Sequence, residues 1–145
     1  MLQGEYNHNL DDKGRLIIPK NLRDDLGESV VVCNGLDGCL FVYPQPEWDK
    51  LVSKLMALPL INEKARNTKR HFIGSSATLE YDKQGRVTLP PSLRKFAGLQ
   101  KEVVLVGVLD KLEVWNLEAW EEEQQKNSIN MKDIMSGLAD DDIVF

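Results

Sequence analysis

The sequence predicts a mixed α+β protein, mostly β, built from two tandem copies of one small module with short helices. Three observations lead to this fold class: an internal repeat, short apolar runs bounded by turn residues in both copies, and a length of 145 residues. This length suits one compact domain or two very small domains that pack closely. Because a module of about 50–60 residues buries little apolar surface alone, we expect the two copies to share a core about a pseudo-twofold axis.

The internal repeat is the clearest feature of the sequence. Residues 11–19 (DDKGRLIIP) match residues 82–90 (DKQGRVTLP) at an offset of 71. Seven of the 17 positions from residue 11 to residue 27 are identical to those 71 residues later, among them a Pro-x-x-Leu-Arg segment that ends at Arg23 and at Arg94. A period of 71 is too long for a solenoid repeat and indicates the duplication of one module.

Each copy begins with a strand, an Asp-x-x-Gly-Arg turn and a second, apolar strand (residues 16–18 and 87–89). Asp favours turn starts through bonds from its side chain to the backbone, and Gly tolerates positive φ. We expect Pro19 and Pro90 at the first position of a short helix, where a missing N–H costs nothing. Gly27 and Gly98 are expected to end that helix.

A β-hairpin follows in each copy, with the strand pairs Val30–Cys33 and Cys39–Tyr43, then Val103–Val106 and Leu112–Trp115. A helix near Pro46 then carries an apolar stripe, interpreted as core packing, at Trp48, Leu51, Val52 and Leu55. A further helix, Asn62–Phe72, bridges the modules. The predicted divisions are residues 1–60 (first module), 61–76 (bridging helix and linker), 77–120 (second module) and 121–145 (an acidic C-terminal tail). We expect the tail to be a helix that frays into disorder at residues 140–142.

The charge is unevenly distributed. The net charge of −5 argues at first against nucleic acid. However, residues 118–145 carry a net charge of −6, whereas residues 62–95 carry a net charge of +5. A local basic surface can still bind phosphate, because salt screens remote charges beyond roughly 8–10 Å.

The sequence points to an intracellular protein. The only two cysteines, Cys33 and Cys39, do not suggest a disulfide framework and fit a reducing compartment. Residues 1–5 have no features of a secretory signal, and the apolar stretch 103–109 is far shorter than the ~20 residues of a membrane span.

The repeated turns are the candidate site. One Asp-x-x-Gly-Arg would indicate no more than a tight turn, but a turn does not need an arginine at the same place twice. We expect Arg15 and Arg86 to project from the turns, where a guanidinium can fork onto phosphate or onto guanine O6 and N7. Lysines in the same turns would add phosphate contacts. The candidate DNA-binding residues are Lys13, Gly14, Arg15, Lys83, Gly85 and Arg86, with Asp11 and Asp82 bracing the turns or orienting the arginines.

Other candidate residues have simpler explanations. Arg66, Lys69 and Arg70 on the bridging helix form either a solvated face or a secondary phosphate or subunit contact. Cys33 and Cys39 miss the spacing of a metal site, and His8 and His71 have no partner pattern, so no metal is expected. The three tryptophans are interpreted as core anchors. No phosphate loop, nucleophile elbow or zinc-protease motif occurs, so no catalytic residue, cofactor or enzymatic activity is predicted.

Four segments carry a family resemblance: residues 4–6 (GEY), 11–19, 39–48 (CLFVYPQPEW) and 82–86 (DKQGR). Together they resemble the MraZ family over nearly the whole chain, from Gly4 to Trp120, and both Asp-x-x-x-Arg signatures of that family are intact. The resemblance implies two AbrB-like swapped-hairpin modules that form a pseudo-twofold barrel. It also implies ring-shaped homo-oligomers in the cytoplasm, associated with the nucleoid, with Arg15 and Arg86 contacting DNA.

The resulting hypothesis is a sequence-specific regulator that binds double-stranded DNA. By resemblance its targets are direct repeats upstream of the cell division and cell wall gene cluster, which includes its own gene; the sign of regulation does not carry over. The alternative is an antitoxin-like or structural protein-interaction module that masks a partner with its acidic tail. A row of basic turns on one face would favour DNA, and polar residues clustered in a pocket would favour an enzyme.

Overall fold

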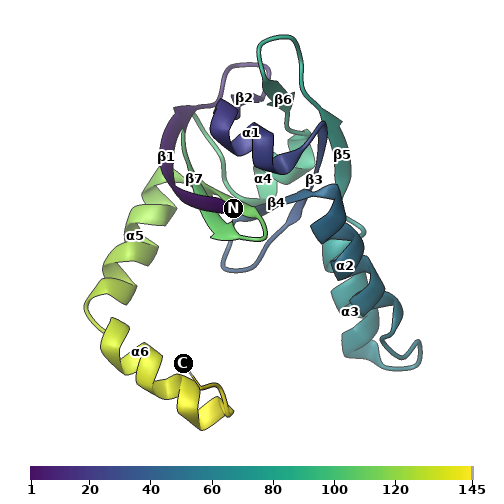
Figure 1. Cartoon of the computed structure of the whole chain (residues 1–145), viewed down its shortest axis with the longest axis vertical. Helices are drawn as coiled ribbons and strands as arrows, with labels where there is room; N and C mark the ends of the chain where they lie inside the picture. The colour runs from purple at the N-terminus through teal and green to yellow at the C-terminus, as the bar shows by residue number, and fades with distance from the viewer. Residues whose placement is uncertain (145) are drawn as a thin grey trace.

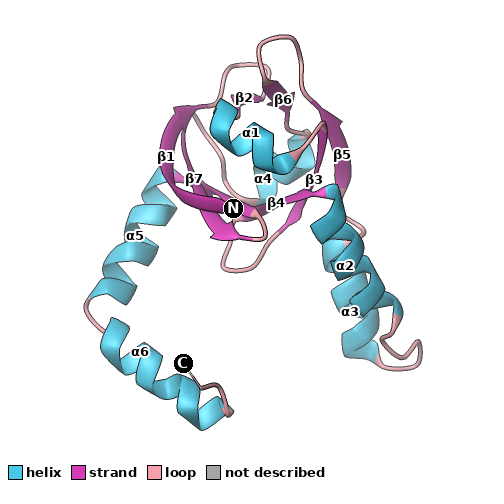
Figure 2. Ribbon diagram, viewed as in Figure 1, coloured by secondary structure: helices cyan, strands magenta, loops and turns pink. Residues whose placement is uncertain are grey.

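The structure is a computed structural model that describes residues 1–144 (Figure 1). It confirms a mixed α+β fold. The main sheet is antiparallel, with six strands in the order β1 (Leu2–Asn9), β7 (Glu102–Leu109), β8 (Leu112–Asn116), β4 (Leu40–Pro44), β3 (Ser29–Asn34) and β5 (Ala77–Glu80). A separate two-stranded ribbon joins β2 (Arg15–Ile17) to β6 (Arg86–Thr88). The sheet does not close into the expected barrel, because β1 and β5 remain as its two edges. It is an open sheet that curves strongly (Figure 2).

Strands from the two halves of the chain alternate in this sheet. The predicted hairpins are confirmed as β3–β4 and β7–β8. However, the first strand of each half pairs with the hairpin of the other half. Strand β1 pairs with β7 over eight residue pairs, and β5 pairs with β3 over four. Neither half therefore completes its own sheet.

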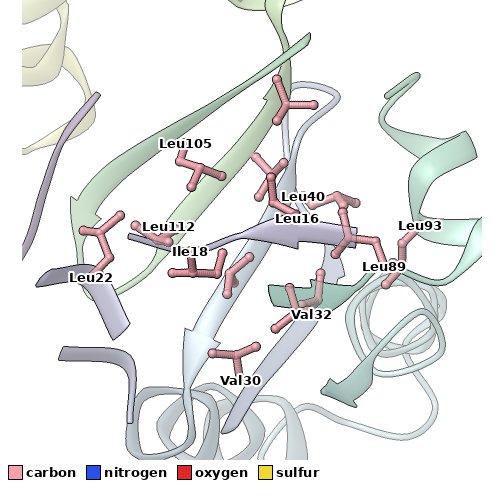
Figure 3. Close-up of a cluster of buried hydrophobic side chains, with 14 of the residues drawn as sticks. Leu16, Ile18, Leu22, Val30, Val32, Leu40, Leu89, Leu93, Leu105 and Leu112 are labelled. Carbon is pink, nitrogen blue, oxygen red and sulfur yellow. The ribbon is translucent and has the colours of Figure 1, made fainter. Parts of the chain in front are cut away.

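The inner face of the sheet encloses the main core (Figure 3). Val30, Val32, Leu40 and Leu105 contribute to it from the strands, and each is at most 1% exposed. Two short helices, α1 (Lys20–Leu26) and α4 (Pro91–Phe96), pack Leu22 and Leu93 against it. Equivalent leucines from both halves thus meet in one core, as the small size of each module requires.

A second apolar cluster lies on the outer face of β3 and β4. The alternate residues Val31, Cys33, Phe41 and Tyr43 belong to it, which explains why all five residues of β4 are buried. Two helices cover this cluster, α2 (Gln45–Met56) and α3 (Glu63–Phe72), with Trp48 of α2 only 8% exposed. The apolar stripe predicted on α2 is confirmed as core packing. The helix predicted between the modules is confirmed as α3. Asn62 caps its first turn, where Asn62 Oδ1 accepts a hydrogen bond from the Ala65 N–H at 3.1 Å.

Two local expectations are corrected. Pro19 and Pro90 are N-caps rather than first helical residues, because their ψ values of 145° and 147° are still extended. Residues 140–142 of the tail were expected to be disordered. The tail instead continues as α5 (Leu117–Ser128), α6 (Met131–Gly137) and a 3₁₀ turn, η1 (Leu138–Asp141). None of these three elements contains a buried residue, and together they extend away from the sheet (Figure 1).

Candidate nucleic-acid interface

The two Asp-x-x-Gly-Arg turns are built alike. In the first turn, Asp11 Oδ1 accepts the backbone N–H groups of Lys13 at 3.0 Å and Arg15 at 2.8 Å. The Gly14 N–H donates back to the Asp11 carbonyl at 3.0 Å, and Gly14 has a φ of +78° that suits glycine. Residues 82–86 repeat the three bonds at 2.9, 2.9 and 3.1 Å.

Each turn also holds its own arginine. Arg15 Nε donates to Asp11 Oδ2 at 2.5 Å, and Arg86 Nε donates to Asp82 Oδ2 at 2.7 Å. The arginine side chains are 31% and 22% exposed, so they do not extend freely into solvent as a projecting side chain would. Among residues 1–144, their Nη atoms make no hydrogen bond, so each arginine is held through Nε with its outer nitrogens still free to donate.

These bonds lower the pKa of both turn aspartates. The largest cause for Asp11 is the backbone N–H of Arg15, with the side chain of Arg15 and the N–H of Lys13 adding to it. The same groups act on Asp82, led by the backbone N–H of Arg86. Both carboxylates therefore stay ionised below their ordinary pKa of 3.8, which keeps the turn and the arginine together.

The ribbon β2–β6 brings the two turns into one site. Its register pairs Arg15 with Thr88 and Ile17 with Arg86, so the turns flank the ribbon symmetrically. The central residues Leu16 and Val87 are buried, which leaves the two arginines on the opposite face. Along the ribbon the arginines are two residues apart, or roughly 7 Å. Figure 1 shows both turns at the same end of the molecule.

Contacts between the modules reinforce this arrangement, and sequence reasoning did not assign them. Arg23 Nε donates to the Ile18 carbonyl at 2.9 Å, and its guanidinium lies over Gly85 of the other turn, where a Cβ would come within 2.7 Å of Cζ. Arg94 lies over Gly14 in the same way. The repeated Leu-Arg at the end of Pro-x-x-Leu-Arg was the available signal, since an apolar core position is followed there by an arginine in both copies.

The remaining candidate residues are placed as follows. Lys13 and Lys83 are exposed in the turns. The basic residues of α3 are at the other end of the molecule and bond locally: Arg66 Nη1 donates to the Ile61 carbonyl at 2.7 Å, and Lys69 Nζ to the Leu58 carbonyl at 3.4 Å. The structure therefore does not bring α3 together with the turns.

Other side chains singled out in the sequence are mostly interior. Trp48 and Trp115 are buried, and Trp120 packs on Trp115 with ring centroids 5.4 Å apart. Cys33 and Cys39 are unbridged and buried, and burial raises the pKa of each thiol to about 12. Within the described part of the chain, His, Cys, Asp and Glu side chains do not gather in threes as a metal site would require. No helix among residues 1–144 has the length and apolar character to cross a bilayer.

The fold and the candidate site together define a class: a duplicated, β-rich protein with matched arginine turns at one end. The sequence profile of a family described as "MraZ protein, putative antitoxin-like" matches this chain twice, over residues 1–71 and 72–141. A protein named "Transcriptional regulator MraZ" from Lachnoclostridium phytofermentans is 51% identical over 136 residues, which cover 94% of this chain and 96% of the relative.

Two further relatives bear the same name. The protein from Lactobacillus delbrueckii subsp. bulgaricus is 46% identical over 97% of this chain and 98% of its own length. The protein from Natranaerobius thermophilus is 43% identical over 99% of this chain and its own full length. The chain belongs to the MraZ family, and these relatives are named as regulators rather than as enzymes.

Proposed function

We propose that this protein is a transcriptional regulator that binds double-stranded DNA in a sequence-specific way through its two turns. The observation that carries the proposal is the pairing of two Asp-x-x-Gly-Arg turns across one ribbon, each with an arginine held through Nε and free at its outer nitrogens. The names of the relatives support it. The major groove is about 12 Å wide and admits a two-stranded β-ribbon, so arginines roughly 7 Å apart fit within one groove.

In this proposal the residues of a turn have separate roles. Arg15 and Arg86 contact guanine edges or phosphates with their outer nitrogens, and Lys13 and Lys83 contact phosphates. Gly14 and Gly85 have positive φ and let the backbone turn sharply just before each arginine. Asp11 and Asp82 brace the turns and orient the arginines rather than touch anionic DNA.

The proposal extends to the fold and the assembly. The exchange of first strands between the halves supports an AbrB-like swapped-hairpin arrangement of two modules, residues 1–60 and 77–120, linked by residues 61–76 and followed by the tail 121–145. Exposed apolar residues on and after α2 and α3, at Met56, Leu60, Ile61 and Ile73, support a homo-oligomer, which we propose is a ring. The proposed targets are direct repeats in promoters of the cell division and cell wall gene cluster, reached in the cytoplasm at the nucleoid.

Selection of bound duplexes from a random DNA pool, followed by titration of arginine variants, tests this function. We expect an enriched direct repeat. Arg15→Ala and Arg86→Ala should each weaken binding to it by roughly 1–3 kcal/mol per contacted site, more than they weaken binding to scrambled DNA. Lys54→Gln, on the exposed face of α2, is the control for loss of one charge. If the pool shows no enrichment, or both arginine variants bind like the wild type, the turns are not a DNA-reading site and the interaction-module alternative gains support.

A further inference from the structure

An open hollow of about 520 Å³ lies beside the first turn. Asp11 and Asp12 of the turn line it, together with two cations from the second module, Arg94 and Lys101. The Leu10 N–H donates to the Lys101 carbonyl at 2.7 Å, which fixes the backbone of Lys101 next to the turn. The hollow is therefore a composite of both halves of the chain.

The two cations of this hollow are not neutralised by the protein. Among residues 1–144, no carboxylate lies within 4.0 Å of Arg94 or Lys101. Arg94 uses Nε to donate to the Leu89 carbonyl at 3.0 Å, and its outer nitrogens make no bond among these residues. Of the two acids in the hollow, Asp11 is already paired with Arg15, so only Asp12 offsets the two cations. The hollow thus carries a net positive charge next to the proposed DNA-contacting turn.

At the second turn Arg23 takes the place of Arg94, but no lysine takes the place of Lys101. The sheet register makes the comparison direct, because Asn9 pairs with Glu102 and Glu80 pairs with Ser29. Lys101 precedes Glu102 beside the first turn, and Glu28 precedes Ser29 beside the second turn, so Lys101 and Glu28 hold equivalent positions. Asn9 and Glu80 are equivalent in the same way, because each lies two residues before its turn aspartate. Asn9 with Glu102 and Glu80 with Ser29 each carry one negative charge, so these two pairs do not differ. The lysine in place of glutamate is the change that makes the surroundings of the first turn more positive.

We propose that Arg94 and Lys101 form a phosphate-binding site for the DNA backbone, and that this site makes the first turn the stronger of the two DNA contacts. This inference rests on the proposed DNA-binding function. The ammonium of Lys101 and the outer nitrogens of Arg94 donate to the oxygens of one phosphate, while Arg15 reaches the base edges from the adjacent turn. The second turn has Arg23 but Glu28 in the place of Lys101, so it makes a weaker contact with the phosphate backbone.

Lys101→Gln is the variant that tests this site, because Lys101 is exposed and its ammonium makes no ion pair among residues 1–144. Binding is measured by anisotropy on the selected duplex and on a scrambled duplex, at several salt concentrations, with the full-length protein. A lost phosphate contact should weaken both duplexes alike, about three- to tenfold, and should lower the slope of log K against log salt by about 0.9 per contacted subunit. Arg94→Gln should act in the same direction.

Two controls separate a contact from general electrostatics. Lys54→Gln removes the same charge far from the turns and should leave the slope unchanged. Glu28→Lys builds the missing cation beside the second turn and should strengthen binding and raise the slope. Equal effects of Lys101→Gln and Lys54→Gln would overturn the site, as would a fall in melting temperature that accounts for the lost binding. If Arg15→Ala still abolishes selective binding in that case, the proposed function stands and only this site fails.

Discussion

At the scale of single residues, Asp11 and Asp82 connect backbone geometry to charge. Each carboxylate accepts two backbone N–H groups through one oxygen and its arginine through the other. An asparagine could replace only part of this, because its amide offers one acceptor oxygen and no charge. The turn and the orientation of its arginine therefore depend on the same ionised side chain.

The lowered pKa values of Asp11 and Asp82 predict how stability depends on pH. A carboxyl group whose pKa is lowered on folding stabilises the native state above its unfolded value, near 3.8, and this contribution is lost as pH falls through the folded pKa. Asp11→Asn should therefore melt at a lower temperature than the wild type at pH 7, with a difference that shrinks below about pH 4. Melting curves from pH 7 to pH 2.5 measure this. Asp12→Asn, at the next position, should show no such difference, and an Asp11→Asn deficit that stays constant with pH would contradict the assignment.

At the scale of elements, the turns and the short helices depend on one another across the modules. Gly85 has a φ of +76° and lies directly beneath the guanidinium of Arg23, which is anchored on the Ile18 carbonyl of the other half. The Ile18 N–H in turn donates to the Gly85 carbonyl at 3.1 Å. Each turn is thus held from outside its own module, and disturbing it should loosen the contact between the two halves.

Gly85→Ala should destabilise the protein by more than about 1 kcal/mol, because the new Cβ meets both an unfavourable backbone conformation and the anchored arginine. Chemical denaturation measures the change in the free energy of unfolding. Gly137→Ala is the matched control. Gly137 has a φ of −66°, and a Cβ added there would have no other group within 4 Å, so alanine should be neutral or slightly stabilising. Similar effects of the two substitutions would show that the guanidinium does not constrain the turn.

At the scale of the whole molecule, an exposed apolar surface and an acidic tail both lie away from the turns. Apolar residues are exposed around α2 and α3, including Ile61 at 91% exposed. The acidic tail extends from the sheet without burying a residue. The first feature indicates a surface that a partner would cover, and the second carries negative charge away from the end that holds the turns.

We expect the protein to assemble in solution, with a mass several times the 16.5 kDa of one chain. The exposed apolar surface would be covered in such an assembly, which is the physical reason for the expectation. Light scattering at working concentrations measures the mass, and Ile61→Glu should lower it by placing a charge in the contact. A monomeric wild type would contradict the proposed ring.

Deletion of residues 136–145 should leave DNA affinity unchanged or stronger, because the segment contains three aspartates and no basic residue. The comparison is a titration of full-length and truncated protein on the selected duplex, with a melting curve as the folding control. A truncated protein that melts normally but binds DNA much more weakly would show that the tail has a positive role in binding.

The sequence by itself determined what depends on neighbouring residues. The duplication, both Asp-x-x-Gly-Arg turns, the β3–β4 and β7–β8 hairpins and a helix over Asn62–Phe72 were all predicted from the sequence, through its repeat, its turn residues and its apolar runs. These succeed because a positive φ, a side-chain cap or a hairpin bond forms within a few residues of the chain. The candidate turn residues themselves could be chosen in the same way, since they occur twice at one spacing.

Only the tertiary structure decided which elements meet. Alternating apolar residues show that a strand has a buried face, but they do not name its partner, so the pairing of β1 with β7 and of β5 with β3 was not predictable from either copy. The position of Arg94 over Gly14 and the hollow that Arg94 shares with Lys101 follow from that exchange. The charge difference between the two turns arises in the same way, because Lys101 and Glu28 are about 55–90 positions from the turns that packing brings them to.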